Sequence, residues 1–143
     1  MIFVNTKLSI LILSISIISC DFGHKFNSEF KNHIAKADSG YFDNDILHPT
    51  HAYYNKGNLI GIEFDSNPEC GNYNRKYIIS NGKTIDKVIV RKNFYTQHCE
   101  IFDSIYVIEP KTNSIKVYTQ NNNESQIINN GLIQRYLIFL KKY

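Results

Sequence analysis

Three hairpin-turn signals constrain the fold of this 143-residue chain more than any other feature. Residues 56–58 (Lys-Gly-Asn), 81–82 (Asn-Gly) and 110–113 (Pro-Lys-Thr-Asn) each separate two segments rich in β-branched and aromatic residues. Asn-Gly is the strongest of these signals because both residues accept a positive φ. Turns this short join antiparallel strands, since a parallel pair needs a crossover of about a dozen residues or more. The sequence therefore predicts an antiparallel meander.

The segments that flank these turns predict about six strands. In the last of them, Ile115, Val117 and Thr119 alternate with Lys116 and Tyr118, which indicates a strand with one buried face. Residues 38–50, 66–75, 93–103 and 121–125 are rich in turn formers or irregular, and are expected to be loops. The expected strands are Ala52–Asn55, Leu59–Asp65, Lys76–Ser80, Thr84–Lys92, Ser104–Glu109 and Ser114–Gln120.

Helices are expected on both sides of the strands. Residues 26–37 have apolar side chains at helical spacing and are followed by an Asp-Ser-Gly stop signal. Leu132–Tyr143 also has a helical pattern, although its apolar run at 136–140 would suit a buried strand. The expected fold is α+β and β-dominated. It is an antiparallel meander of about six strands, in a curled sheet, small barrel or sandwich, with an N-terminal and a C-terminal helix.

The first nineteen residues have the pattern of a secretion signal. Lys7 precedes an apolar run from Leu8 to Ile18 that only serines interrupt. Eleven residues are too few to span a bilayer, which takes about 20. The length is typical of the hydrophobic region of a signal peptide. The run ends in Ile-Ile-Ser-Cys at residues 17–20.

These four residues resemble the lipobox of bacterial lipoproteins, which has an aliphatic, a tolerant and a small residue before an invariant cysteine. The resemblance covers only about the first 20 residues. It implies cleavage after Ser19 and a lipid on Cys20. The chain would then comprise a signal peptide (1–19), a lipidated tether (20–25) and one β-rich domain (26–143), anchored to a membrane of the bacterial cell envelope. An ordinary signal peptide or an uncleaved anchor is the alternative.

The cysteine count agrees with a lipidated Cys20. Cys70 and Cys99 then remain as a pair, and a pair in an oxidising compartment is expected to form a disulfide. In the chain-entropy model, a closed loop of about 30 residues contributes about 3.6 kcal/mol of stability. The alternatives are two free thiols, or a catalytic Cys99 beside His98. Neighbouring residues of an extended chain point to opposite faces, so they make a poor nucleophile–base pair.

The charge pattern argues against a nucleic-acid partner. The formal net charge is +3, and removal of the signal would take Lys7 away. The remaining charges are scattered, whereas nucleic-acid-binding domains carry a clustered basic face.

Two patterns could carry chemistry. His48 and His51 are three residues apart and could bind a metal with His98, although Pro49 places them in a loop. Glu63 and Asp65 would share one face of a strand about 7 Å apart, a separation that could suit acid–base catalysis. Isolated loop histidines and solvated strand carboxylates are the commoner cases. Neither a metal, a cofactor nor a catalytic residue is therefore expected.

Aromatic residues are abundant, with ten tyrosines, nine phenylalanines and no tryptophan. Exposed tyrosines are enriched at binding interfaces. Tyr53, Tyr54, Tyr73 and Tyr95 are therefore the candidate binding surface. The alternative is that they pack across strands within the sheet.

Together these patterns favour a membrane-anchored, non-enzymatic module that binds another envelope or secreted protein, as an inhibitor or an immunity protein would. This comparison is one of architecture alone. One alternative is a small envelope enzyme with a metal at His48, His51 and His98. The other is a structural or assembly lipoprotein of a larger envelope machine.

Overall fold

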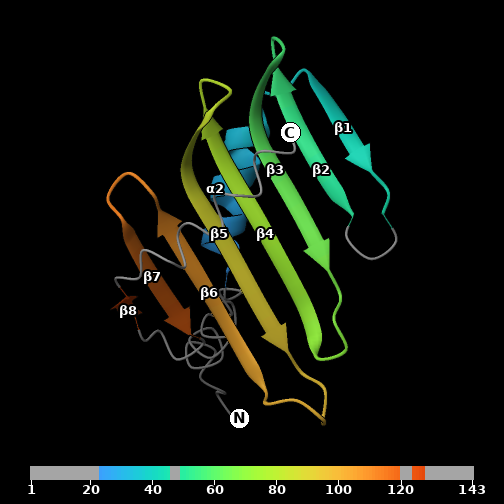
Figure 1. Cartoon of the computed structure of the whole chain (residues 1–143), viewed down its shortest axis with the longest axis vertical. Coiled ribbons are helices and arrows are strands. Elements are labelled where there is room, and N and C mark those ends of the chain that lie inside the picture. The colour runs from blue at the N-terminus through green and yellow to red at the C-terminus, as the bar shows by residue number, and fades with distance from the viewer. Residues whose placement is uncertain (1–22, 46–48, 120–123, 128–143) are drawn as a thin grey trace, which may run out of the picture.

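A computed structural model describes residues 23–45, 49–119 and 124–127 of the chain. Figure 1 shows these residues as a sheet with a helix on one face. The elements are α2 (His24–Ile34), β1 (Ser39–Asp43), β2 (Thr50–Asn55), β3 (Asn58–Ser66), β4 (Gly71–Ser80), β5 (Thr84–Phe94), β6 (Phe102–Glu109), β7 (Ser114–Thr119) and β8 (Glu124–Ile127).

The eight strands form one antiparallel sheet in the order of the sequence. Each strand pairs with the next, and β1 and β8 are the two edges among the described strands, so the sheet is open. The predicted β-dominated antiparallel meander is thereby confirmed. Two more strands are present than expected, because β1 forms within residues 38–50 and β8 overlaps residues 121–125, where loops were predicted.

The three predicted hairpin turns lie together at one end of the sheet, the upper end in Figure 1, which we call the turn end. They join β2 to β3, β4 to β5 and β6 to β7. Positive φ angles occur at Lys56 (50°), Gly57 (75°), Asn81 (52°), Gly82 (68°) and Asn113 (52°). The prediction from local turn chemistry is confirmed in all three places.

Longer connections lie at the opposite end, which we call the loop end. Residues 67–70 join β3 to β4, and residues 95–101 join β5 to β6. Residues 71–75 were predicted to be loop, but they belong to β4. They are held in the sheet because they pair with residues 90–94 of β5.

One face of the sheet is covered by α2. The predicted helix at 26–37 is present, although it begins two residues earlier and ends three residues earlier. Phe30 is 1% exposed and packs in a cluster with Ile78, Ile89, Ile105 and Val107 of three strands. Burial of this apolar stripe gives the helix a stability that its 11 residues would not have alone.

The other face of the sheet carries a second, larger apolar cluster. Tyr77 and Val88 are fully buried there, and the strands alternate between the two clusters, as the pleat requires. The predicted C-terminal helix (Leu132–Tyr143), the predicted signal peptide and Cys20 lie outside the described residues.

Candidate functional site

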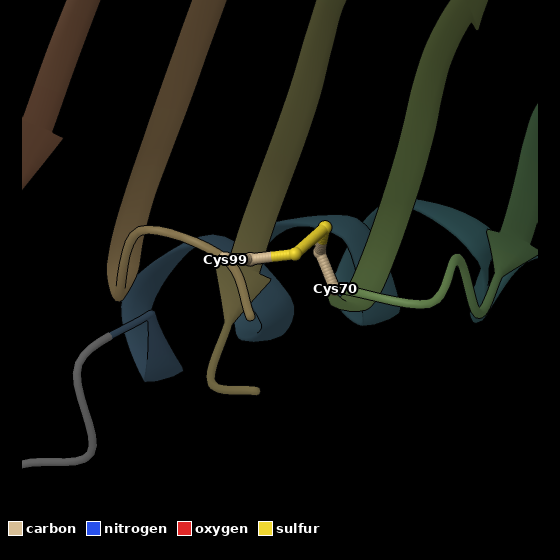
Figure 2. The surroundings of a disulfide bond; sticks show 2 residues. All are labelled: Cys70 and Cys99. Atoms are coloured by element: carbon tan, nitrogen blue, oxygen red, sulfur yellow. A yellow bond between two sulfur atoms is a disulfide. The ribbon is translucent and has the colours of Figure 1, made fainter. Parts of the chain in front are cut away.

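A disulfide joins Cys70 and Cys99 at the loop end, as predicted (Figure 2). The two Cα atoms are 5.5 Å apart. Two backbone hydrogen bonds support the link: Tyr95 N–H donates to the Cys70 carbonyl at 2.9 Å, and Cys99 N–H donates to the Thr96 carbonyl at 3.1 Å. Because both sulfur atoms are bonded, Cys99 carries no thiolate, and the alternative of a catalytic thiol is excluded in this state.

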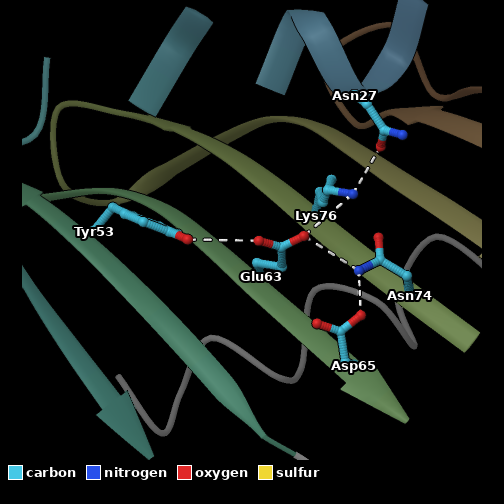
Figure 3. Close-up of polar contacts among 6 residues, drawn as sticks. All are labelled: Asn27, Tyr53, Glu63, Asp65, Asn74 and Lys76. Atoms are coloured by element: carbon cyan, nitrogen blue, oxygen red, sulfur yellow. Dashed lines mark hydrogen bonds and ion pairs between the residues drawn. The ribbon is translucent and has the colours of Figure 1, made fainter. Parts of the chain in front are cut away.

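A polar cluster lies under α2, with Glu63 of β3 at its centre (Figure 3). The Glu63 carboxylate accepts a hydrogen bond from the Asn74 side-chain amide at 3.3 Å and pairs with the Lys76 ammonium at 3.2 Å. The Tyr53 hydroxyl donates to the same carboxylate at 3.5 Å. Burial of Tyr53, followed by the negative charge of Glu63, raises the pKa of the phenol above its ordinary value. Tyr53 therefore keeps its proton at neutral pH and acts as a donor.

Lys76 connects this cluster to the helix. Its ammonium donates to the Asn27 side-chain oxygen of α2 at 2.8 Å, and its side chain is only 12% exposed. Figure 3 shows Lys76 between Asn27 and Glu63. The hydrogen bond from Lys76 to Asn27 thus helps to fix the position of α2 over β3 and β4, in addition to the apolar packing beside it.

Glu63 and Asp65 do lie on one face, as the alternation predicts, because both accept hydrogen bonds from the Asn74 amide. The bond to Asp65 measures 2.6 Å. Glu63 has three donors around it, from the side chains of Asn74, Lys76 and Tyr53. The arrangement orders the sheet and the helix, because it joins side chains of β3, β4 and α2.

A cavity of about 370 Å³ adjoins the cluster near the start of α2. Arg91 in its wall donates two hydrogen bonds to Asp103, at 3.1 and 2.8 Å. The two cations of the wall, Lys76 and Arg91, thus both have carboxylate partners. Neutral amides supply much of the remaining polar wall: Asn27, Asn67, Asn72, Asn74 and Asn93. The cavity therefore suits a small, uncharged, polar ligand better than an anion.

The four candidate tyrosines do not form one surface. Tyr53 packs beneath α2, with its ring 5.9 Å from that of Phe30. Tyr54 and Tyr73 pack against the apolar cluster on the other face. Tyr95 is 58% exposed at the loop end. Tyr53, Tyr54 and Tyr73 are therefore packed within the fold. Only Tyr95 of the four candidates is largely exposed.

His51 and His98, two of the histidines of the metal alternative, lie in different parts of the fold, with β3 and β4 between them in the strand order. His51 is exposed in β2, where its ring lies 4.2 Å from that of Phe42. His98 is exposed in the connection between β5 and β6. His48 lies outside the described residues. Within residues 23–45, 49–119 and 124–127, no three His, Cys, Asp or Glu side chains form a group that could hold a metal ion.

Three large apolar residues are exposed that the sequence patterns did not single out. Tyr41 and Phe42 of the edge strand β1 are 57% and 51% exposed, and Ile101 at the loop end is 80% exposed. A signal existed for Ile101, which follows Thr96, Gln97, His98 and Glu100 in an irregular segment. No comparable signal existed for β1, because its exposure depends on its place at the edge of the sheet.

No protein-family model, curated protein or solved structure matches this chain. In the described part of the chain, no helix has the length and apolarity needed to cross a membrane.

Proposed function

We propose that this chain is a lipid-anchored protein of the bacterial envelope that binds another protein through the edge strand β1. The observation that carries the binding proposal is the exposure of Tyr41 and Phe42 on this strand. The anchor rests on the residue pattern at 17–20 and on the oxidised cysteine pair that remains once Cys20 is assigned to the lipid.

An edge strand offers backbone groups as well as side chains. Among the described strands, β1 pairs with β2 alone, so its outer edge has no described strand beside it. Such an edge can accept an extended segment of a partner, whose backbone adds one more strand to the sheet. Tyr41 lies opposite Ala52 and Phe42 opposite His51, so the two rings project on opposite faces and would flank an added strand.

Site-specific photocrosslinking tests the binding proposal. A crosslinking amino acid at Tyr41 should give a discrete adduct with one envelope protein. The same group at Lys83, an exposed residue of the turn end, should not. The variant Phe42→Ala should weaken binding of that partner about tenfold or more, the effect expected of a central aromatic contact, while Lys83→Ala leaves it unchanged. Equal labelling from both positions, or no adduct from Tyr41, would contradict the proposal.

The anchor has its own test. Metabolic labelling with palmitate should mark the natural chain and not the Cys20→Ala variant. An unlabelled natural chain would refute the lipid anchor and leave the edge-strand proposal standing.

The amide-lined cavity supports a second candidate function, the binding of a small neutral ligand. An amide offers both a donor and an acceptor, which suits hydroxyl and amide groups of a sugar. N-acetylglucosamine carries both groups and is a suitable probe. It should shift the NMR signals of Asn72, Asn74 and Asn93 in the natural chain, and Asn93→Leu should abolish those shifts. The absence of shifts at millimolar sugar would exclude this class of ligand.

A further inference from the structure

We propose that the loop end of the sheet rests on the lipid surface, with Ile101 and Tyr95 inserted at the interface between headgroups and acyl chains. This inference depends on the lipid anchor at Cys20 that is proposed above. It specifies which part of the domain meets the membrane, and thereby which parts are left free for a partner.

The tether is too short to hold the domain away from the bilayer. Only two residues separate Cys20 from Gly23, the residue before α2. Three steps along the chain span at most about 11 Å, even when fully extended. The tether therefore keeps Gly23, and the part of the domain around it, within about 11 Å of the surface to which Cys20 is attached.

The start of α2 is directed toward the loop end. A Cβ atom on Gly23 would lie 3.0 Å from the Ile105 side chain and 3.3 Å from that of Arg91. Arg91 is three residues from the end of β5, and Ile105 is three residues from the start of β6. At about 3.3 Å per residue, Gly23 is therefore some 10 Å from the end of these strands, a distance that the tether can span.

The loop end presents apolar side chains that suit such a surface. Ile101 is 80% exposed and Tyr95 is 58% exposed, and both lie in the connection that the disulfide fixes to β4. Transfer of an aliphatic side chain from water into the acyl region lowers the free energy. Tyrosine is enriched where hydrocarbon meets headgroups. Because the disulfide fixes this connection, its backbone does not have to be ordered when the two side chains meet the membrane.

Two other described surfaces, the turn end and the outward side of α2, are polar and suit water. At the turn end the exposed residues include Lys56, Lys83 and Lys111. The outward side of α2 exposes Lys31 and Asn32. A membrane lying along α2 is the rival orientation, because its lysines would attract anionic lipids.

Tryptophan fluorescence distinguishes these orientations, since the natural chain contains no tryptophan. The lipidated full chain is placed in phosphatidylcholine vesicles, with and without lipids brominated near the headgroup end of the acyl chain. Four variants each carry one tryptophan: Ile101→Trp and Tyr95→Trp report the loop end, Asn32→Trp reports α2, and Lys83→Trp reports the turn end. Phosphatidylcholine is chosen because exposed Glu69 and Glu100 would repel anionic lipids.

The two loop-end variants should show blue-shifted emission and lose about half of it or more to the brominated lipid, as expected for side chains inserted 5–10 Å below the surface. Emission of the Asn32→Trp and Lys83→Trp variants should be unchanged. Quenching at Asn32, or none at either loop-end residue in a chain that floats with the vesicles, would overturn the orientation. A chain that does not float with the vesicles would instead refute the lipid anchor, so the two failures are distinguishable.

Discussion

The two ends of the sheet are built by different means. At the turn end, short hairpins depend on local backbone chemistry, namely positive φ angles at residues such as Gly57, Asn81 and Gly82. At the loop end, longer connections are held by contacts distant in sequence, namely a disulfide and an ion pair between β5 and β6. The turn end is polar, whereas the loop end exposes Ile101 and Tyr95. The two ends of one sheet can thus be held by different interactions and can expose different kinds of side chain.

Removal of the disulfide should have the largest effect on this comparison. The double variant Cys70→Ala/Cys99→Ala should lose about 3–4 kcal/mol of unfolding free energy, because the unfolded chain regains the entropy of an open loop of about 30 residues. Urea unfolding of the variant and of the natural chain measures the difference. A loss below about 1 kcal/mol would mean that the strand pairing of β4 and β5 already orders the loop end.

A matched pair of glycine substitutions compares the two ends directly. At Gly71 (φ 148°) a Cβ atom would lie 2.2 Å from the Asn93 carbonyl oxygen, so Gly71→Ala should cost about 3 kcal/mol or more. At Gly57 (φ 75°) a Cβ atom would meet nothing within 4 Å, so Gly57→Ala should cost only the conformational strain, about 1 kcal/mol. Thermal unfolding of both variants measures the contrast, and equal losses would contradict it.

Two ion pairs extend the comparison to smaller effects. Asp103 is 6% exposed and accepts two hydrogen bonds from Arg91, so Asp103→Asn should cost about 1–2 kcal/mol. At the turn end, Lys111 is 63% exposed in its pair with Asp86, so Lys111→Ala should cost about 0.5 kcal/mol or less. Chemical denaturation resolves this difference. A larger loss of stability from Lys111→Ala than from Asp103→Asn would contradict this ranking of the two ion pairs.

The smallest predicted effect is a pH dependence at the turn end. The hydrogen bond from Lys111, with help from Ser80, lowers the pKa of Asp86. A lowered pKa means that ionised Asp86 stabilises the folded chain above its ordinary, unfolded pKa of about 3.9. This contribution is lost as the pH falls through the lower folded value. The stability difference between Lys111→Ala and the natural chain should therefore be present at neutral pH and vanish in strong acid. A difference that persists in acid would mean that the lysine acts through packing.

The sequence predicted the turn end well because its signals are local. Asn81 and Gly82 accept a positive φ wherever they occur, so no knowledge of distant residues was needed. The antiparallel order followed directly from the three short turns. The disulfide was also predictable, because Cys70 and Cys99 are the pair that remains if Cys20 is assigned to a lipid.

The loop end was less predictable because distant contacts override local preference there. Asn72 and Asn74 are typical of loops, yet they lie in β4, where β5 pairs with their backbone. Asn74 is also satisfied by Glu63 and Asp65, which a single sequence cannot place beside it. The same limit applies to β1, whose five residues form a strand because β2 pairs with them.

In the polar cluster under α2, one feature was likewise predictable from the sequence and another was not. The alternation of β3 placed Glu63 and Asp65 on one face, and the structure has them there. The contact between Lys76 and Asn27 could not be predicted from the sequence, because it depends on where α2 crosses the sheet. Neighbouring Tyr53 and Tyr54 pack on opposite faces of the sheet, as adjacent residues of a strand do, so the four candidate tyrosines do not share one face.

The strictly sequential order of the strands has a consequence for how the chain assembles. Almost all strand contacts are between neighbours in sequence, and such local contacts form quickly. The helix α2 is the exception, since Phe30 is buried against Ile105, which follows it by 75 residues. When the chain is made from its N-terminus, α2 is therefore the first of the described elements to emerge and among the last to be covered. Its apolar stripe stays open until β6 is in place, which makes this helix the segment most in need of protection during biogenesis.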